Sequence, residues 1–480
     1  MKFSPDIEAF VKDFTKDLIE RNVAVFAGAG MSKMAGFVNW PELLKDIADE
    51  LGLNIDKEHD LISVAQYHVN ENKGRAKLNR KILEEFSHEA ESTPNHKIIS
   101  QLPITTIWTT NYDTLIEDAL RSNNKVPDVK HEIEQLATTR PKRDVVVYKM
   151  HGDVHHPAKA VLTKEQYELY YKTHEHFITA LNGDLISKTF VFIGFSFTDP
   201  NLNYVLSRLT GSFGENTRQH YCFIRKNKKG KDEDEGISKY NSRKQELMIN
   251  DLKRYKIKAL LIDDYNEITQ VLKEIQLRIK KRAIFISGSA EEYGRFSRND
   301  ALSLIHLLSK KIIQSELTII NGFGWGLGSA VINGALEAIY EKPERYSEDQ
   351  LIMRPFPQLQ SGTDSLQVLW EQYRQRMISM AGICLIIFGN KKGEDGKLIN
   401  AGGVKREFEI ALEHGLVPIP IAATGYMARE IYELISENED KYYPDNRKWL
   451  IPIVKELASE KITRDEIITK VVEAIQTLIK

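Results

Sequence analysis

Three short motifs contain residue types that could bind and cleave a nucleotide. Gly28-Ala29-Gly30 follows the apolar run at 23–26, and Asn111 and His151 each follow another strand-like apolar run. Backbone N–H groups at a glycine turn can face phosphate, an amide can hydrogen-bond a ribose hydroxyl or a water, and an imidazole titrates near neutral pH. In a parallel α/β sheet, the carboxyl ends of the strands form the edge where nucleotides bind. We therefore predict a dinucleotide site, with NAD as the expected substrate.

The chemistry that suits these residues is cleavage of the bond between nicotinamide and ribose. Positive charge develops on the sugar while the pyridinium leaves, so the protein must position the dinucleotide, exclude bulk water and aim one nucleophile. We predict that His151 is the general base and that Asn111 orients the ribose or a water. Asp113 is expected to orient its loop or to cap the helix that follows.

The elements that must position these residues alternate between strands and helices. Residues 6–20 have the apolar spacing of an amphipathic helix, and the polar run at 226–236 is expected to be a solvated loop. Strand-like segments lie at 23–26, 106–108, 145–148, 189–193, 220–224 and 259–262. This alternation predicts an α/β domain over residues 1–280 with a doubly wound, mostly parallel sheet.

A second α/β domain of the same class is predicted over residues 281–480. Its strand-like segments are 283–289, 317–322, 384–389 and 416–421, and an amphipathic helix closes the chain. After the second of these runs come four glycines at alternate positions, in Gly322-Phe323-Gly324-Trp325-Gly326-Leu327-Gly328. Such glycines allow backbone to approach a phosphate or ribose before a helix begins, so this domain is also predicted to bind a nucleotide.

Composition excludes several other classes of function. The chain has 480 residues and a net charge of −2, so no basic excess indicates nucleic-acid binding. Cys222 and Cys384 are the two cysteines, too few for a cysteine-based zinc site or a disulfide framework, and no metal is predicted. The sequence has no apolar signal segment and no run of about 18 apolar residues, so we expect a cytoplasmic protein that does not bind membranes.

The first domain resembles the sirtuin family over roughly its first 275 residues. The segment 28–36 resembles the opening sirtuin motif, Thr110-Asn111-Tyr112-Asp113 resembles the Gln-Asn-Ile-Asp element, and His151-Gly152 matches the catalytic His-Gly. Gly194-Phe195-Ser196 resembles the Gly-Thr-Ser that contacts the cofactor. The resemblance implies NAD contacts from Ala27, Gly28, Ala29, Ser32, Asn111, Asp113, His151, Gly194 and Ser196.

Two departures from the sirtuin pattern narrow what the resemblance implies. Sirtuin deacylases carry a Cys-x-x-Cys pair twice for structural zinc, and this chain lacks that module. Where the family has Ile-Pro-Asp-Phe-Arg, the chain has Phe37-Val38-Asn39-Trp40-Pro41, without the arginine. Both departures fit the zinc-free sirtuin-like domains that hydrolyse NAD.

Residues 281–480 resemble the SLOG family, which is related to the Smf DNA-processing proteins and to phosphoribohydrolases. Enzymes of that superfamily show Pro-Gly-Gly-x-Gly-Thr-x-x-Glu, whereas this chain has Asn400-Ala401-Gly402-Gly403-Val404-Lys405-Arg406-Glu407. The loss of the proline and of Gly-Thr favours ligand sensing over catalysis. The expected ligand contacts are Gly288, Ser289, Gly324, Trp325, Gly326, Leu327, Arg374, Lys391, Gly402, Gly403 and Glu407, with Arg376 and Lys392 as alternatives to the neighbouring cations.

A sirtuin-like domain followed by a SLOG domain resembles the NAD-hydrolysing effectors of the Thoeris anti-phage system. The resemblance implies a homo-oligomer, usually a tetramer. It implies that the SLOG domain binds a cyclic ADP-ribose isomer made by a TIR-domain partner protein, and that binding switches on NAD depletion in the infected cell. A ligand that binds only the active arrangement would shift the population toward it.

Three alternatives remain open at the level of sequence. The chain could be an NAD-dependent protein deacylase, although the zinc module is absent. It could be a nucleotide-binding scaffold with a dead first domain, although Asn111 and His151 are both retained. The Smf likeness would suggest DNA binding, but the chain lacks a basic patch.

Overall fold

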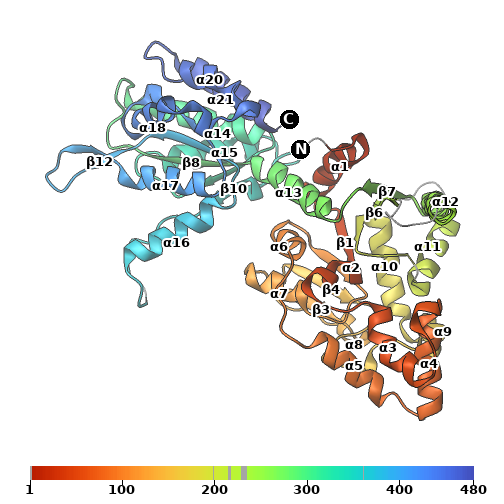
Figure 1. Cartoon of the computed structure of the whole chain (residues 1–480). Helices are drawn as coiled ribbons and strands as arrows, with labels where there is room; N and C mark the ends of the chain where they lie inside the picture. Colours follow the sequence, from red (N-terminus) through yellow and green to blue (C-terminus); the bar gives the residue numbers. More distant parts are fainter. Residues whose placement is uncertain (1–2, 198, 214–217, 229–234, 361, 480) are drawn as a thin grey trace. The chain divides into compact units, whose positions relative to one another are not determined.

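The computed structural model describes residues 3–197, 199–213, 218–228, 235–360 and 362–479 (Figure 1). The chain divides into two compact units, residues 1–276 and 277–480. Each unit is an α/β fold around its own parallel sheet, which confirms the predicted fold class. In the described part of the chain, no helix is long and apolar enough to cross a membrane.

The sheet of the first unit has seven strands in the order β3-β4-β2-β1-β5-β6-β7. Every neighbouring pair is parallel, so all seven carboxyl ends lie at one edge. The strands are β1 (Val23–Ala27), β2 (Thr106–Thr109), β3 (Pro127–Lys130), β4 (Val145–Lys149), β5 (Thr189–Ile193), β6 (His220–Arg225) and β7 (Ile257–Ile262). The central strands β1 and β5 are buried at every residue, as expected for strands covered on both faces.

The helices of the first unit precede, connect or follow these strands, and the last of them, α13, crosses the boundary into the second unit. They are α1 (Pro5–Ile19), α2 (Ala29–Ser32), α3 (Trp40–Glu50), α4 (Leu61–Asn72), α5 (Ala76–Phe86), α6 (Pro94–Gln101), α7 (Leu115–Ser122), α8 (Ile133–Leu136), α9 (Lys164–Thr173), α10 (Glu175–Ser187), α11 (Pro200–Phe213), α12 (Glu235–Leu252) and α13 (Asn266–Lys281). Helix α3 begins with a capping box in which Asn39 accepts from Glu42 N–H and the Glu42 side chain accepts from Asn39 N–H. The segment that replaces the sirtuin arginine motif therefore starts a helix. Of the predicted loop at 226–236, residues 229–234 lie outside the described part.

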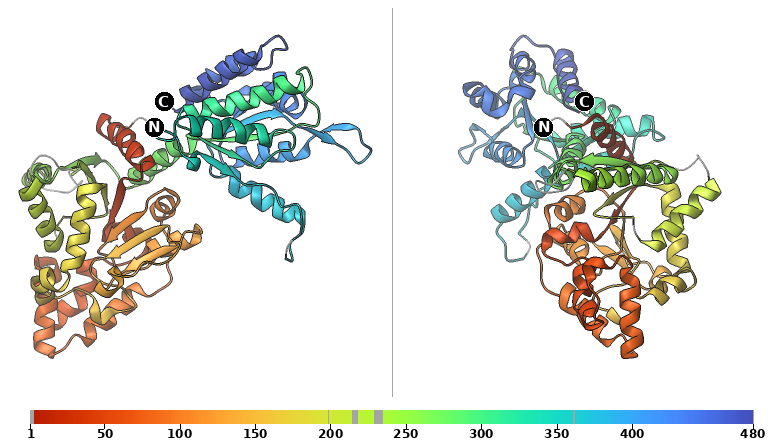
Figure 2. Two further views of the ribbon diagram at one scale, coloured as in Figure 1. Left: turned by 180° about the vertical axis from the view of Figure 1, so that it is seen from behind. Right: turned by 45° about the vertical axis from the view of Figure 1, so that its right-hand side comes forward.

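The sheet of the second unit has five parallel strands in the order β10-β9-β8-β11-β14. The strands are β8 (Ala283–Ser289), β9 (Thr318–Asn321), β10 (Leu351–Met353), β11 (Ile383–Phe388) and β14 (Val417–Pro420), and a hairpin is formed by β12 (Asn390–Lys392) and β13 (Leu398–Asn400). The helices are α14 (Arg298–Gln314), α15 (Gly328–Glu341), α16 (Leu366–Ile378), α17 (Gly402–Glu413), α18 (Tyr426–Glu437), α19 (Glu439–Tyr442), α20 (Leu450–Glu456) and α21 (Arg464–Ile479). Figure 2 shows helices on both faces of this sheet, with α14 packed between α15 and α21.

Each sheet has one point at which the direction of strand addition reverses. In the first unit the chain builds outward from β1 to β2 and beyond, then returns to place β5 on the other side of β1. In the second unit β8 and β11 have the same relation. At such a point the loops after two adjacent strands leave toward opposite faces, and the crevice between them is where α/β folds bind ligands. The glycine motifs predicted from sequence follow these strands.

Candidate functional site

Four loops at the carboxyl edge of the first sheet carry the predicted NAD-site residues. Gly28 follows β1, Asn111 follows β2, His151 follows β4 and Gly194 follows β5. The strands β4, β2, β1 and β5 are consecutive neighbours in the sheet, so these loops are adjacent along one edge. The geometry therefore brings the motifs together as the sequence predicts.

The glycines of the first motif are required by contact between two loops. A Cβ on Gly28 would lie 2.4 Å from Gly194 O, and one on Gly194, whose φ is +67°, would lie 2.3 Å from Met31 N. Gly28 N–H donates to Ile193 O and Gly30 N–H donates to Gly194 O, each at 2.9 Å. This corrects part of the sequence argument. These two N–H groups are satisfied within the protein and do not face a phosphate in this conformation.

Asn111 is a buried amide that ties the β2 loop to the β1 loop. Its Nδ2 donates to Gly28 O at 3.1 Å and to Ser32 Oγ at 3.0 Å, while its backbone N–H donates to Thr109 Oγ1 at 3.0 Å. The amide has one oxygen besides these donors, so Oδ1 is the atom that remains to accept a hydrogen bond. Because the NH2 group is fixed, the orientation of Oδ1 is fixed as well.

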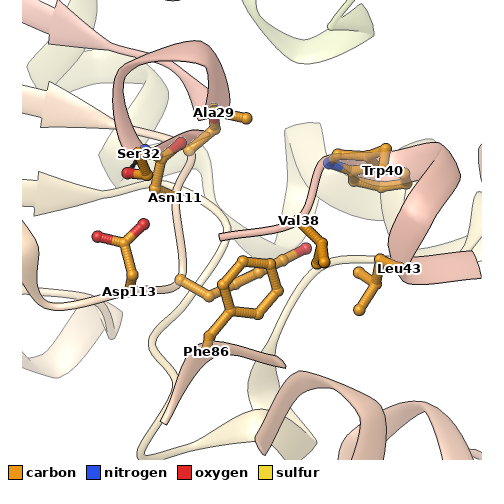
Figure 3. Close-up of a pocket in the computed structure, with 10 residues that line it drawn as sticks. Ala29, Ser32, Val38, Trp40, Leu43, Phe86, Asn111 and Asp113 are labelled. Atoms are coloured by element: carbon orange, nitrogen blue, oxygen red, sulfur yellow. Dashed lines mark hydrogen bonds between the residues drawn. The ribbon is translucent and has the colours of Figure 1, made fainter. Parts of the chain in front are cut away.

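A pocket of about 380 Å³, including its open mouth, lies beside Asn111 (Figure 3). Its polar residues come from the α2 and β2-loop segments, and its apolar wall comes from α3, the segment just before α3, and α5. The lining residues are Ala29, Ser32, Val38, Trp40, Leu43, Phe86, Thr110, Asn111, Tyr112 and Asp113. A mixed wall of this kind suits a ligand with an aromatic ring and a sugar.

Asp113 performs the structural task that the sequence predicts, and it also borders this pocket. Its Oδ1 accepts from Leu115 N–H at 3.1 Å, at the start of α7. Its Oδ2 is buried without a hydrogen-bond partner among the described residues. Thus Asp113 has one oxygen committed to the fold and one uncommitted oxygen in the pocket region.

His151 is more enclosed than a freely accessible base would be. Its side chain is 1% exposed, and it does not line the pocket beside Asn111. Its Nε2 lies 3.2 Å from Asp199 Oδ2, and its Nδ1 lies 3.4 Å from the Tyr167 hydroxyl. Burial lowers the pKa of His151 and the Asp199 carboxylate opposes that effect. At neutral pH the imidazole is therefore neutral and able to accept a proton.

Asp199 is the residue of this site that sequence reasoning missed. The sequence identified Asp199-Pro200-Asn201 only as a helix start, and the structure confirms this because Oδ1 accepts from Asn201 N–H at 2.9 Å and Leu202 N–H at 3.1 Å. Its other oxygen faces His151. The helix-start motif was the signal, but 48 residues separate the two side chains, so only the fold reveals the pair.

The other predicted NAD-site residues lie around these loops in different roles. Ala27 is fully buried at the end of β1, and its carbonyl accepts from Thr109 Oγ1 at 2.9 Å. Ser196 is exposed after β5. Of the two tryptophans considered as shields, Trp40 lines the pocket, whereas Trp108 is a core residue whose Nε1 donates to Asp184 Oδ2 at 2.8 Å.

One group of side chains in the described part has donor atoms of the kind that bind transition metals. Single donor atoms of His131, Glu132 and His156 lie within 4.8 Å of one another. The Glu132 carboxylate is already paired with Lys159 Nζ at 2.6 Å. A cation in this position competes with a metal for the carboxylate, so the group carries no assignment.

In the second unit, glycines again allow loops to meet at the switch point. A Cβ on Gly288 would lie 2.3 Å from Ile387 O, and one on Gly324 would lie 2.0 Å from Gly288 O. Gly326 has a φ of +72°, and a Cβ there would lie 1.9 Å from Ala290 O. These glycines thus let β8 lie backbone to backbone against β11, and let the loop after β9 lie against the end of β8 and the residue that follows it.

A buried acid and an arginine lie beside these loops. Glu407 on α17 accepts from Ser287 Oγ at 2.5 Å, and Arg374 Nε on α16 lies 3.6 Å from Glu407 Oε1. The Arg374 guanidinium also lies 5.0 Å from the centre of the Phe356 ring and close to Gly403. Burial raises the pKa of Glu407, while Ser287 and Arg374 oppose that effect. This cluster can offer both a cation and a carboxylate to a nucleotide.

The structure distinguishes between the cations that sequence left as alternatives. Arg374 belongs to the Glu407 cluster, whereas Arg376 is exposed. Lys391 and Lys392 are both exposed on β12, and Lys392 Nζ pairs with Glu291 Oε1 at 2.8 Å. The remaining predicted ligand contacts differ in their exposure and bonding. Ser289 Oγ donates to Asn390 O, and Trp325 is 72% exposed and donates from Nε1 to Glu291. Leu327 is buried, and Gly402 begins α17.

Comparison with known protein families matches both units. Residues 105–245 match the family described as a SIR2-like domain, and residues 267–478 match the one described as the Sir2- and TIR-associating SLOG family. The first match includes Asn111, His151 and Gly194, and the second includes the Glu407 cluster. The fold and the two sites therefore define a protein with a SIR2-like domain followed by a SLOG domain.

Full-length relatives specify the family further. The chain is 47% identical over 479 residues to NAD(+) hydrolase ThsA of Bacillus cereus (strain MSX-D12), covering 100% of both chains. It is 46% identical over 485 residues to the protein of that name from Cytobacillus dafuensis, covering 98% of this chain and 97% of the relative. The corresponding protein of Acinetobacter baumannii (strain 532279) is 43% identical over 482 residues, covering 99% and 100%. The chain belongs to the ThsA family of NAD(+) hydrolases.

Proposed function

We propose that the first unit hydrolyses NAD to nicotinamide and ADP-ribose at the edge where the β1, β2, β4 and β5 loops meet. The observation that carries the proposal is the fixed Asn111 amide at the pocket, next to the loop that holds a neutral, buried His151. The full-length similarity to proteins named NAD(+) hydrolase supports the same activity.

Each residue has a defined task in this proposal. Water attacks the anomeric carbon of the nicotinamide-bearing ribose, the bond from that carbon to the pyridinium nitrogen breaks, and nicotinamide leaves with the bonding electrons. His151 accepts the proton of the attacking water, and Asp199 stabilises the imidazolium that results. Asn111 Oδ1 accepts from a ribose hydroxyl or from the water. The apolar wall formed by Trp40 and its neighbours excludes bulk water from the nicotinamide end.

The enclosure of His151 supports a regulated activity. The base is 1% exposed and is absent from the pocket lining, so NAD cannot reach it unless the residues that cover it move. The described cover includes Tyr167 on α9, whereas Asp199 keeps its contact with His151 when the cover moves. We infer that the conformation described here is silent and that activation exposes His151.

We propose that the activator is a cyclic ADP-ribose isomer bound at the Glu407 cluster of the second unit. Arg374 would bind its phosphates, Glu407 would accept from ribose hydroxyls, and Trp325 would stack on its base. The second family is described as Sir2- and TIR-associating, which supports a TIR-domain partner as the source. In this proposal the protein is a cytoplasmic homo-oligomer, a tetramer, that stops phage infection by depleting NAD.

The test is product analysis with the purified full chain, with and without a panel of cyclic ADP-ribose isomers. We expect nicotinamide and ADP-ribose in equal amounts, without an acyl peptide, and only in the presence of one isomer. His151→Ala should abolish cleavage and leave activator binding intact. If NAD cleavage requires an acyl peptide, the protein is a deacylase. If the rate of NAD cleavage is the same with and without every isomer, the sensor assignment is refuted.

A further inference from the structure

Lys149 is a charged residue enclosed directly beneath the candidate active-site loops. It is the last residue of β4, two positions before His151, and its side chain is 0% exposed. Burying an ammonium group away from water is costly unless it is paired and hydrogen-bonded. Such a residue must therefore be held by specific partners, and here the partners lie on the two loops that carry Asn111 and His151.

All three protons of the Lys149 ammonium are used in loop contacts. Its Nζ donates to Tyr112 O at 3.0 Å and to Asp113 O at 2.6 Å, in the loop that carries Asn111. It also donates to Asp153 Oδ2 at 2.6 Å, in the loop that carries His151. A lysine has three donors, so no further hydrogen bond is available to it.

Charge partners stabilise the cation in this position. The Glu117 carboxylate on α7 lies 3.2 Å from Nζ, in addition to that of Asp153. Burial alone would lower the pKa of Lys149, but these carboxylates hold it above its usual value. Lys149 therefore stays charged throughout the neutral range. Glu117 Oε1 has no hydrogen-bond partner among the described residues, so it contributes charge without fixing either loop.

Two other bonds link the two loops. The Tyr112 hydroxyl donates to Val161 O at 2.8 Å, and Val161 N–H donates to His151 O at 2.8 Å. Val154 N–H donates to Tyr112 O at 3.0 Å, so this carbonyl accepts from both Lys149 and the His151 loop. The other oxygen of Asp153 accepts from His155 N–H at 2.9 Å and gives the loop its turn. The position of His151 relative to Asn111 is thus set by these bonds together with the three loop contacts of Lys149.

We propose that Lys149 is a positioning residue for NAD cleavage, which holds the Asn111 and His151 loops at a fixed separation without touching the substrate. This role rests on the hydrolase function proposed above. Misplacing a reacting group by about 1 Å can cost about 100-fold in rate. A loss of positioning should therefore reduce kcat more than it weakens NAD binding, because Lys149 holds only the β2-loop part of the pocket lining and not the residues on α3 and α5.

The test compares Lys149→Met with Glu117→Gln in the full chain, using the cyclic ADP-ribose isomer that activates the wild type. Methionine removes all three loop contacts, whereas Glu117→Gln removes only the charge partner that fixes neither loop. We expect Lys149→Met to lower kcat about 100-fold, with KM changed less than about threefold. Glu117→Gln should keep kcat within about threefold, even if its melting temperature falls.

Each outcome decides the role of Lys149. A folded Lys149→Met protein with kcat within threefold of the wild type would overturn the proposal and leave the hydrolase function standing. If Lys149→Met does not fold, Asp153→Asn decides, because it keeps both contacts of Lys149 to the Asn111 loop and weakens the contact to the His151 loop. A loss of at least about tenfold in kcat would support positioning, and an unchanged kcat would overturn it. A wild type that cleaves no NAD under any condition would refute the hydrolase function itself, and the positioning role with it.

Discussion

His220 should make the first unit unstable in mild acid. This residue begins β6, is 2% exposed, and its Nδ1 accepts from Phe190 N–H of β5 at 3.1 Å. Burial, with a smaller contribution from Arg218, lowers its pKa from 6.5 to about 4. The folded state therefore disfavours the proton that the unfolded chain binds. The stability that depends on neutral His220 is fully present above pH 6.5 and is lost as the pH falls from 6.5 toward 4.

The magnitude follows from the two pKa values. Between pH 7 and pH 5, a histidine whose pKa falls from 6.5 to about 4 on folding loses about 2 kcal/mol of its contribution to unfolding free energy. His96 and His174, whose pKa values burial also lowers to about 4, add to the loss in the wild type. His220→Asn cannot be protonated, and its Oδ1 can replace Nδ1 as the acceptor. The variant should thus lose about 2 kcal/mol less than the wild type on the same change of pH.

The measurement is urea unfolding at pH 7 and at pH 5. The unfolded fraction is read by pulsed hydrogen exchange on peptides from β5 and β6. All labelling pulses are given at the same pH, so that only the unfolding equilibrium differs between the two series. Restricting the readout to these strands separates the first unit from the second. His176→Asn is the matched control, since His176 is exposed on α10 and should leave the pH dependence unchanged. If His220→Asn loses as much stability as the wild type between the two pH values, the assignment of a neutral, accepting His220 is refuted.

Four further predictions concern the two candidate sites. Because burial lowers the pKa of His151 in the conformation described here, its imidazole should titrate below pH 6.5 in activator-free protein when followed by NMR, and a midpoint above that value would contradict a buried base. Asp199→Asn keeps an N-cap for α11 but removes the charge that raises this pKa, so the midpoint in activator-free protein should move to lower pH. A shift upward would show that Asp199 does not face His151 in this conformation. Gly194→Ala adds about 1–2 kcal/mol of left-handed backbone strain and about 1–3 kcal/mol of overpacking, and should lower stability by about 2–5 kcal/mol. The control Gly183→Ala, on an exposed helical position with open space, should stabilise by up to about 1 kcal/mol. Arg374→Ala should abolish the thermal shift caused by the activating cyclic ADP-ribose isomer, whereas the exposed Arg376→Ala should retain it; the reverse result would move the site away from Glu407.

Sequence patterns predicted most of the framework because most strands here are short, continuous apolar runs. The central strands β1, β5, β8 and β11 all appeared within a few residues of their observed bounds. The strand β3, Pro127–Lys130, was missed because it is a short edge strand that begins with proline and contains two charged residues. The strand β10 has only three residues, and such a length is too short to show a period.

The site was less predictable than the framework, for a physical reason. Motifs at strand ends identified Asn111 and His151, but the partners of a side chain depend on packing between distant segments. The Asp199 carboxylate precedes α11, 48 residues beyond His151 in the chain, and only the tertiary fold brings the two side chains together. Lys149 is recognisable in the sequence as a charged residue at the end of an otherwise apolar strand. The sequence does not show to which carbonyl oxygens its ammonium group donates.

The contact between Gly28 and Gly194 has a consequence for anyone who recombines this enzyme with its relatives. The β1 and β5 loops meet backbone to backbone, with no side-chain layer that could absorb a mismatch. The two glycines are 166 residues apart in the chain, yet both loops must be taken from the same parent protein when a hybrid is built. A chimaera whose crossover falls between them inherits two half-interfaces of different origin. Crossovers outside residues 28–194 keep the pair intact and are the ones that should yield folded hybrids.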